Sequence, residues 1–170
     1  MIAIAEEHIA GFRAAVDSVA RELRYIAFLE APPINEVRDF VHANIAAGVP
    51  QFVAIADGKV LGWCDVLPKP RPAMRHSGVL GMGIIEGYRG RGIGRALIRA
   101  TLEAAKVKGM TRIELTVRVD NPVAKHLYEA LGFIVEGLCR RHMRIKGEYH
   151  DSYLMALLDG TNGQAAGLRL

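Results

Sequence analysis

The sequence predicts an α+β domain in which helices flank a mixed, mostly antiparallel sheet. Two amphipathic segments come first, runs rich in β-branched residues follow, and a strand–helix–strand unit occupies the middle of the chain. That unit, from Val79 to Val119, makes two strands parallel, because the crossover helix returns the chain in the same direction. Turns at Asp57-Gly58 and Lys146-Gly147 suit hairpins, which imply antiparallel neighbours on either side. The 170 residues fit one domain over 1–170, with a frayed tail over 159–170.

Two helices are predicted before the first strand. Apolar residues from Ile9 to Ile26 recur at alternating spacings of three and four, which places them on one helical face. The run Ala31-Pro32-Pro33 ends this helix, because proline cannot continue the backbone hydrogen-bond ladder. A second helix is predicted from about Asn35 to Ala47, where Gly48 provides a C-terminal stop.

The hydrophobic pattern then changes to that of strands. A hairpin is predicted with strands at residues 51–56 and 60–67. A proline-containing loop follows at residues 69–75, and a third strand at residues 79–85. The third strand contains Gly81 and Gly83. Glycine inside a strand often marks the close approach of another chain or of a ligand.

The second half is predicted to contain a helix at residues 91–108, a strand at 112–119 and a short helix at 122–131. A closing hairpin follows, with strands at residues 133–145 and 148–158. Gly109 and Gly132 follow the two helices as C-terminal stops. Asn121 is a favoured N-cap for the short helix, and Pro122 takes its favoured first position.

Composition excludes several classes of protein. Hydrophobic residues make up 51% and charged residues 24%, which is typical of a folded globular protein and not of a disordered one. No run approaches the roughly 18 apolar residues of a membrane span, and early acidic residues argue against a secretory signal. We therefore expect a cytoplasmic protein that does not bind a membrane, with Cys64 and Cys139 reduced. The histidines lack metal-ligand spacing, so no metal is expected.

The clearest functional signal is a turn in which glycines and arginines alternate. The residues concerned are Arg89, Gly90, Arg91, Gly92, Ile93, Gly94 and Arg95. Here a strand becomes a helix, so backbone N–H groups can approach an anion while the helix start adds positive potential. The pattern predicts a pyrophosphate site; the alternative is a glycine-rich turn with solvated arginines.

Two familiar phosphate motifs do not fit this turn. A P-loop needs Lys followed by Ser or Thr after its last glycine, whereas Gly94 is followed by Arg95-Ala96. In a dinucleotide-binding turn Arg95 would occupy the place of the third glycine. Glu114 falls about where a ribose-binding acid is expected, but the chain lacks the repeated βαβ units of that fold.

Two motifs occur in order, about 30 residues apart. The first is Arg89-Gly-Arg-Gly-Ile-Gly94, and the second runs from Asn121 through Leu127-Tyr128 to Gly132-Phe133. With these motifs and its order of elements, the chain resembles the GNAT superfamily of N-acetyltransferases over nearly its whole length. The segment from Lys146 to Met155 is similar to bacterial members that act on amino acids, small amines or protein N-termini.

The resemblance implies acetyl-CoA as donor and a primary amine as acceptor: an amino acid, a small amine or a protein N-terminus. It implies direct attack through a tetrahedral intermediate, and a central parallel strand pair that splays so that pantetheine inserts between the strands. By the same analogy, the backbone of Met82, Gly83 and Ile84 holds the pantetheine arm. The turn from Arg89 to Arg95 holds the pyrophosphate, and Asn121 forms a hydrogen bond near the pantetheine.

The resemblance also suggests catalytic residues. Tyr128 stands at the family's general-acid position, where its phenol would protonate the departing thiolate; the alternative is a core tyrosine. The backbone N–H near Ile84 would stabilise the oxyanion. The base is open, because Thr116 stands where alanine acetyltransferases of the family carry Glu. Glu114 on the same strand face, His76 or a chain of water molecules could serve instead, and Glu114 could equally be a solvated acid.

The acceptor side is expected to include Tyr25, Phe28 and Glu30, with the closing hairpin opposite. Each has a plainer interpretation, as core aromatic residues and a surface acid. The competing function is a non-catalytic module that senses acyl-CoA. Nucleic acid is not expected as a partner, because no basic stripe interleaved with aromatic residues accompanies the net charge of +4. The sequence leaves open whether the protein is a homodimer.

Overall fold

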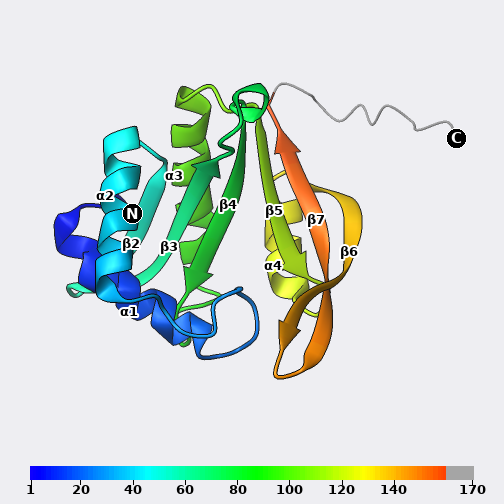
Figure 1. Cartoon of the computed structure of the whole chain (residues 1–170), viewed down its shortest axis with the longest axis horizontal. Helices are drawn as coiled ribbons and strands as arrows, with labels where there is room; N and C mark the ends of the chain where they lie inside the picture. The colour runs from blue at the N-terminus through cyan, green and yellow to red at the C-terminus, as the bar shows by residue number, and fades with distance from the viewer. Residues whose placement is uncertain (160–170) are drawn as a thin grey trace, which may run out of the picture.

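A mixed sheet of seven strands organises residues 1–159, which are the residues that the computed structural model describes (Figure 1). The sheet order is β1-β2-β3-β4-β5-β7-β6. The strands are β1 (Ile2–Ala3), β2 (Gln51–Ala56), β3 (Lys59–Pro68), β4 (Ser77–Ile84), β5 (Arg112–Arg118), β6 (Ile134–Ile145) and β7 (Glu148–Leu158). The helices are α1 (Ile9–Ala20), α2 (Ile34–Ala47), α3 (Ile93–Val107) and α4 (Pro122–Glu129), with 3-10 turns at Glu6–His8 and Pro72–Met74. The predicted α+β class is confirmed.

The helices cover both faces of the sheet. In Figure 1, α1 and α2 lie in front of β2 to β4, while α3 lies behind them and α4 lies behind β5. Both α1 and α3 pack on β3, which is therefore buried on each side. A strand covered on two faces must be apolar at nearly every position, and β3 meets this condition except at a few residues.

The parallel strands β4 and β5 diverge after a short junction. Only Ser77–Val79 and Arg112–Glu114 are in register, although β4 continues to Ile84 and β5 to Arg118. Every other pair of neighbouring strands in the described sheet is antiparallel. The splayed central pair implied by the family resemblance is therefore present.

The first helix is shorter than the sequence predicts. The apolar spacing predicted a helix reaching Ile26, but α1 ends earlier and Leu23 adopts a left-handed backbone conformation with φ of 53°. The chain then runs as an irregular segment, residues 21–33, towards β5. There Arg118 donates a hydrogen bond to the carbonyl oxygen of Arg24 over 2.6 Å. Tertiary contact outweighs the local helical pattern in this segment.

Two strand glycines make room for side chains of β3. A Cβ at Gly83 would lie 2.3 Å from the indole ring of Trp63, and one at Gly81 would lie 3.2 Å from the carboxylate of Asp65. The Trp63 ring also meets Phe12 of α1 edge to face, with centroids 5.8 Å apart. The register between β3 and β4 is continuous. The two glycines thus serve cross-strand packing, which the sequence pattern did not distinguish from the approach of a ligand.

Several local signals form the structures that they predict. The side-chain oxygen of Asn121 caps α4 by accepting a hydrogen bond from the N–H of Ala124 over 3.2 Å. The closing hairpin turns at Lys146-Gly147, where the glycine has φ of 88°. Cys64 is buried, Cys139 is partly exposed, and the two thiols are not joined to each other.

The ends of the chain differ from expectation. The short strand β1, which was not predicted, pairs with β2. Asp159, expected to begin the frayed tail, is held in place because its N–H donates to the carbonyl oxygen of Thr111 over 2.9 Å. The rest of that expected tail, 160–170, lies outside the described residues.

The contact between Gly83 and Trp63 can be tested by substitution. Gly83→Ala should lower the free energy of unfolding by about 1–3 kcal/mol, because the new methyl group overlaps the indole ring. Gly137→Ala in β6 is the matched control, since a Cβ there meets nothing within 4 Å, and its effect should stay within about 0.5 kcal/mol. Urea denaturation measures both; equal losses for the two variants would contradict the packing argument.

Candidate active site

The turn that follows β4 exposes backbone groups. Gly90 and Gly92 have left-handed φ of 75° and 81°, and a Cβ at either would meet nothing within 4 Å. α3 begins at Ile93 directly afterwards. The first N–H groups of a helix lack intrahelical partners, so an anion can accept hydrogen bonds from them. This geometry supports the predicted anion site.

The predicted role of Arg89 in that site needs correction. Its terminal nitrogens pair with the carboxylate of Glu22, and its Nε donates to the carbonyl oxygen of Ile84 over 2.8 Å. The guanidinium therefore ties the turn to the 21–33 segment instead of facing a phosphate. Arg91 and Arg95 are exposed beside the start of α3 and are the cations left for an anion there.

Three elements meet close to this turn. A Cβ at Gly94 would lie 3.4 Å from the side chains of Leu127 in α4 and of Met82 in β4. The first turn of α3, the middle of β4 and the helix α4 therefore surround the place where β4 and β5 diverge. Asn121, predicted near the pantetheine, uses its side-chain oxygen as the N-cap of α4 and has its amide N–H groups left to donate.

Tyr128 lies on the α3 and α4 side of the sheet. The residue is only 8% exposed, and its ring meets Phe133 edge to face at 5.9 Å between centroids. Burial, with a smaller contribution from the neighbouring Cys64 thiol, raises the pKa of the Tyr128 hydroxyl above its usual value. The hydroxyl is therefore protonated at neutral pH, and the same burial makes it a weaker acid than a solvated phenol.

Glu114 is poorly suited to the role of base that the sequence suggested. Its carboxylate accepts hydrogen bonds from Lys69 over 2.5 Å and from Arg112 over 2.7 Å. The hydrogen bond from Lys69 has the largest effect on the pKa of Glu114 and lowers it, and the hydrogen bond from Arg112 lowers it further. The carboxylate therefore binds a proton more weakly. Arg112 also pairs with Glu136. The group is a structural ion-pair network beside the parallel junction.

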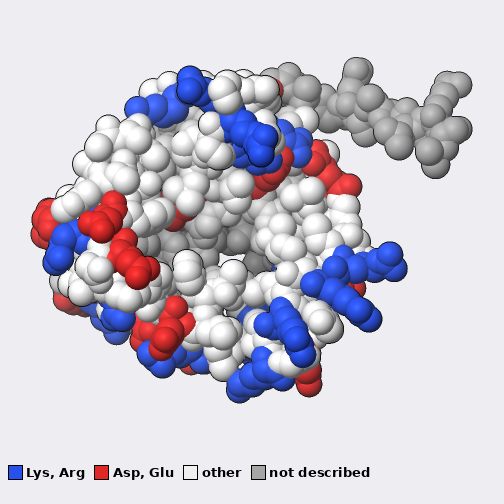
Figure 2. All heavy atoms as spheres, in the orientation of Figure 1, with Lys and Arg blue, Asp and Glu red and all other residues white. Residues whose placement is uncertain are grey.

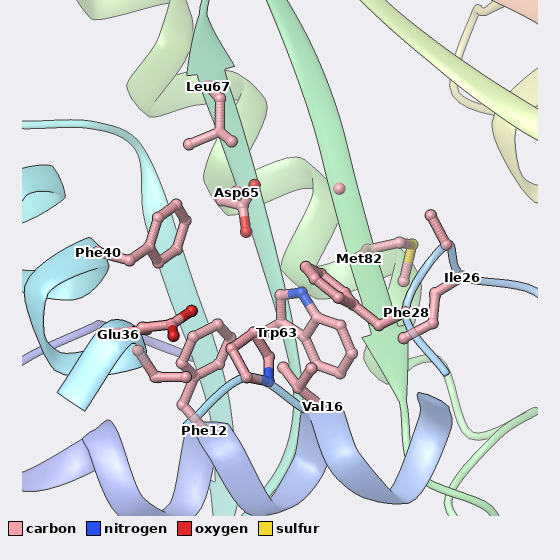
Figure 3. A pocket seen from close by; sticks show the side chains of 14 residues that line it. Phe12, Val16, Ile26, Phe28, Glu36, Phe40, Trp63, Asp65, Leu67 and Met82 are labelled. Carbon is pink, nitrogen blue, oxygen red and sulfur yellow. The ribbon is translucent and has the colours of Figure 1, made fainter. Parts of the chain in front are cut away.

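A cavity of about 440 Å³ lies on the opposite face, between the sheet, α1, α2 and the 21–33 segment (Figure 3). Its wall is aromatic and aliphatic, formed by Phe12, Val16, Ile26, Ala27, Phe28, Pro32, Val37, Phe40, Trp63, Leu67, Gly81 and Met82. Two carboxylates, Asp65 and Glu36, complete the lining. Ligand sites of this size are commonly apolar with a few convergent polar groups.

Asp65 is the unusual group in this cavity. It is 6% exposed and projects from β3 between Phe40 and Trp63 (Figure 3). Burial raises the pKa of Asp65 to about 7, because no hydrogen bond or cation among residues 1–159 offsets the loss of hydration. Side chains alternate along a strand, so Asp65 projects towards α1 while its neighbour Cys64 projects towards α3 and Tyr128. A buried carboxylate and a buried phenol thus lie on opposite faces of the sheet.

Sequence reasoning missed Asp65 because nothing local distinguishes it. It is one acid within the predicted strand 60–67, and no motif surrounds it. The one signal was its place in an otherwise apolar run, Val60 to Leu67, where a charged residue requires a reason.

Of the residues predicted on the acceptor side, one lines the cavity. Phe28 covers it from the 21–33 segment and is 51% exposed. Tyr25 does not belong to the lining. Glu30 pairs with Arg21 at the surface over 3.3 Å, so the plainer interpretation of this acid holds.

Two further features concern residues 1–159. No three His, Cys, Asp or Glu side chains in this range are grouped so that they could hold a metal ion. No helix in the same range combines the length and the apolar character needed to cross a membrane.

Comparison with known proteins agrees with this geometry. The model of the Acetyltransferase (GNAT) family matches residues 15–133. The L-amino acid N-acetyltransferase AaaT of Escherichia coli strain K12 is 36% identical over 110 residues, which span 64% of this chain and 68% of that protein. The chain belongs to the GNAT family and is an acetyl-CoA-dependent acetyltransferase.

Solved structures share the fold. An acetyltransferase of the GNAT family from Streptococcus pneumoniae superimposes with a TM-score of 0.83 at 29% identity, covering 91% of this chain and 96% of that one. A GNAT superfamily phosphinothricin acetyltransferase from Sinorhizobium meliloti, in complex with acetyl-CoA, gives 0.80 at 20% identity, covering 93% and 90%. The overall fold of this chain is thus shared with solved GNAT acetyltransferases.

The burial of Asp65 predicts a pH-dependent stability. Because its pKa is higher in the folded protein than the ordinary 3.8, the folded state holds a proton that the unfolded state releases, and stability falls as pH rises towards about 7. Asp65→Asn removes this titration, so its stability relative to the parent should increase by up to about 3 kcal/mol between about pH 5 and pH 8. Thermal and urea denaturation across that range measure the difference.

The matched control is Asp39→Asn on α2, where the side chain is exposed. Both variants keep the other ionisable groups near Asp65, which are Glu36 in the cavity lining and the Cys64 thiol. A parallel pH dependence for the parent and Asp65→Asn would disprove the raised pKa.

Proposed function

We propose that the protein transfers an acetyl group from acetyl-CoA to a primary amine by direct attack through a tetrahedral intermediate. The observation that carries the proposal is the divergence of β4 from β5. The turn at residues 89–95, called the anion turn below, lies at one end of this gap, and the cavity that Asp65 lines lies on one face of the sheet. The donor and the acceptor would then approach the same stretch of β4 from different directions.

Donor binding falls to the backbone. The N–H groups from Gly90 to Arg95 would bind the pyrophosphate, with Arg91 and Arg95 as the nearby cations. The edge of β4 at Met82, Gly83 and Ile84 is unpaired on its β5 side and would take the pantetheine arm as an additional strand does.

The acceptor amine would lose its proton to Asp65. The Asp65 carboxylate lies over Gly81. Gly83, where the pantetheine arm would bind, is two residues further along β4 and about 7 Å from Gly81, a distance that one amine or one bridging water spans. An apolar cavity stabilises a neutral amine beside a carboxylic acid relative to the ammonium–carboxylate ion pair, which favours this proton transfer. The acid limb of kcat/KM near pH 7 should therefore disappear in Asp65→Asn.

The tetrahedral intermediate would collapse on the other face of the sheet. The backbone N–H near Ile84 would donate to the oxyanion, and Arg89 holds the carbonyl of the same residue in place. Tyr128 would give its proton to the departing thiolate, since it lies on the side where α4 meets β4.

The donor site is tested by Gly92→Asp. The substitution places a side chain and a negative charge in the anion turn, so the rise in Tm that acetyl-CoA gives the parent should vanish. Gly147→Asp is the matched control, because that glycine also has a left-handed φ and open surroundings but lies in the distant β6–β7 hairpin. A Tm shift retained by Gly92→Asp would refute the site.

Catalysis, as opposed to mere sensing of acyl-CoA, is tested by Tyr128→Phe. Loss of the acid should lower kcat by roughly 10²–10⁴-fold while affinity for acetyl-CoA barely changes. Tyr149→Phe, at an exposed position, should keep full activity. Thiol release with a good acceptor measures turnover; a Tyr128→Phe enzyme with more than about a third of the parent kcat is incompatible with the acid role.

A further inference from the structure

The charges around the Asp65 cavity restrict which amine can enter. Its ionisable lining groups are two carboxylates, Asp65 and Glu36, and no Lys, Arg or His side chain belongs to the lining among the described residues. An ammonium group that enters has two anionic partners. A carboxylate that enters has none, and an unpaired charge in an apolar site is strongly disfavoured.

Arginines on the neighbouring elements already have partners, and Arg13 of α1 donates to the carbonyl oxygen of the lining residue Pro32 over 2.9 Å. Arg89 is bound to Glu22, and Arg118 is bound to Asp120 and to the carbonyl of Arg24. Arg24 itself places its guanidinium over the Tyr25 ring, at 5.0 Å from the centroid, and Tyr25 lies outside the cavity lining. None of these groups is directed to a carboxylate inside the cavity.

The wider surface is mixed in charge. On the face drawn in Figure 2, acidic side chains lie over the region of α1 and α2 with basic ones among them, and basic side chains gather over the β6–β7 hairpin and at the upper edge of the view. The surface is hollowed between the helical side and the hairpin. The selectivity for a cation therefore rests on the two carboxylates of the cavity lining.

The wall chemistry defines the rest of the ligand. Phe12, Phe40 and Trp63 present ring faces and edges, with Phe28 next to Trp63, and such walls favour an aromatic or branched apolar group (Figure 3). Peptide carbonyl groups would lose hydration against this wall without gaining a side-chain donor, because the polar side chains of the lining are the carboxylates Asp65 and Glu36. A small ligand with one amine is the better match.

We infer that the acceptor is a small apolar monoamine that carries no carboxylate, held by Asp65 and Glu36 at its ammonium group and by the aromatic wall at its other end. This inference rests on the proposed acetyl transfer and selects one acceptor class among amino acids, small amines and protein N-termini. It also separates this chain from its relative AaaT, whose name specifies L-amino acids.

The test compares three acceptors that share one phenyl group: 2-phenylethylamine, L-phenylalaninamide and L-phenylalanine. Binding is read from the fluorescence of Trp63, the single tryptophan of the chain, which forms part of the cavity wall. Turnover is read from thiol release with acetyl-CoA. The amine should bind and react at least about tenfold better than phenylalanine, with the amide between them.

A charge substitution supplies the second arm. Glu36→Arg places a cation at the cavity and should shift the kcat/KM ratio towards phenylalanine by about tenfold relative to Glu36→Gln, which only removes the negative charge. An unchanged ratio in Glu36→Arg would count against the cavity as the acceptor site.

The outcomes separate the two proposals. Phenylalanine, or a peptide amide with an N-terminal phenylalanine, used as well as the amine would overturn the inferred class and leave acetyl transfer standing. Selective binding of the amine without acetylation of any acceptor would support the cavity's selectivity and refute the proposed function. Equal or absent fluorescence responses to all three compounds would overturn the inference directly.

Discussion

The short parallel junction between β4 and β5 is the constraint on which the rest of the structure depends. A continuous parallel pair would satisfy the backbone groups of both strands, but here pairing ends after three residues on each strand. The remaining edge of β4 is a row of N–H and C=O groups that needs a partner. The anion turn, α4 and the 21–33 segment all surround that edge, so the fold prepares a place for an extended ligand.

Keeping the strands apart requires contacts that hold the surrounding segments in place. Arg118 at the end of β5 binds the backbone of the 21–33 segment, and Arg89 binds Glu22 of the same segment together with the carbonyl of Ile84. The segment is thereby fixed to both diverging strands. Arg89, which motif reasoning assigned to a phosphate, thus links the end of β4 to the 21–33 segment.

Asp65 is unfavourable for stability, and its surroundings show why it can nevertheless persist. Gly81 opposite leaves space over its carboxylate, and Trp63 with Gly83 packs the adjacent layer tightly. A buried acid without partners destabilises the charged state of the protein, whereas hydrophobic residues at the same position would stabilise the core. Such local conflicts with folding are typical of sites selected for chemistry.

The sequence by itself determined the features that depend on neighbours along the chain: the Asn121 cap, the hairpin turns, the glycine turn before α3 and the parallel unit around it. Their geometry follows from backbone conformation and short-range hydrogen bonds. Only the tertiary structure decided the burial of Asp65, the end of α1 and the ion pairs of Arg89 and Glu114, because each depends on residues distant in sequence. Burial and ion pairing arise when segments meet in space, and a local pattern contains neither.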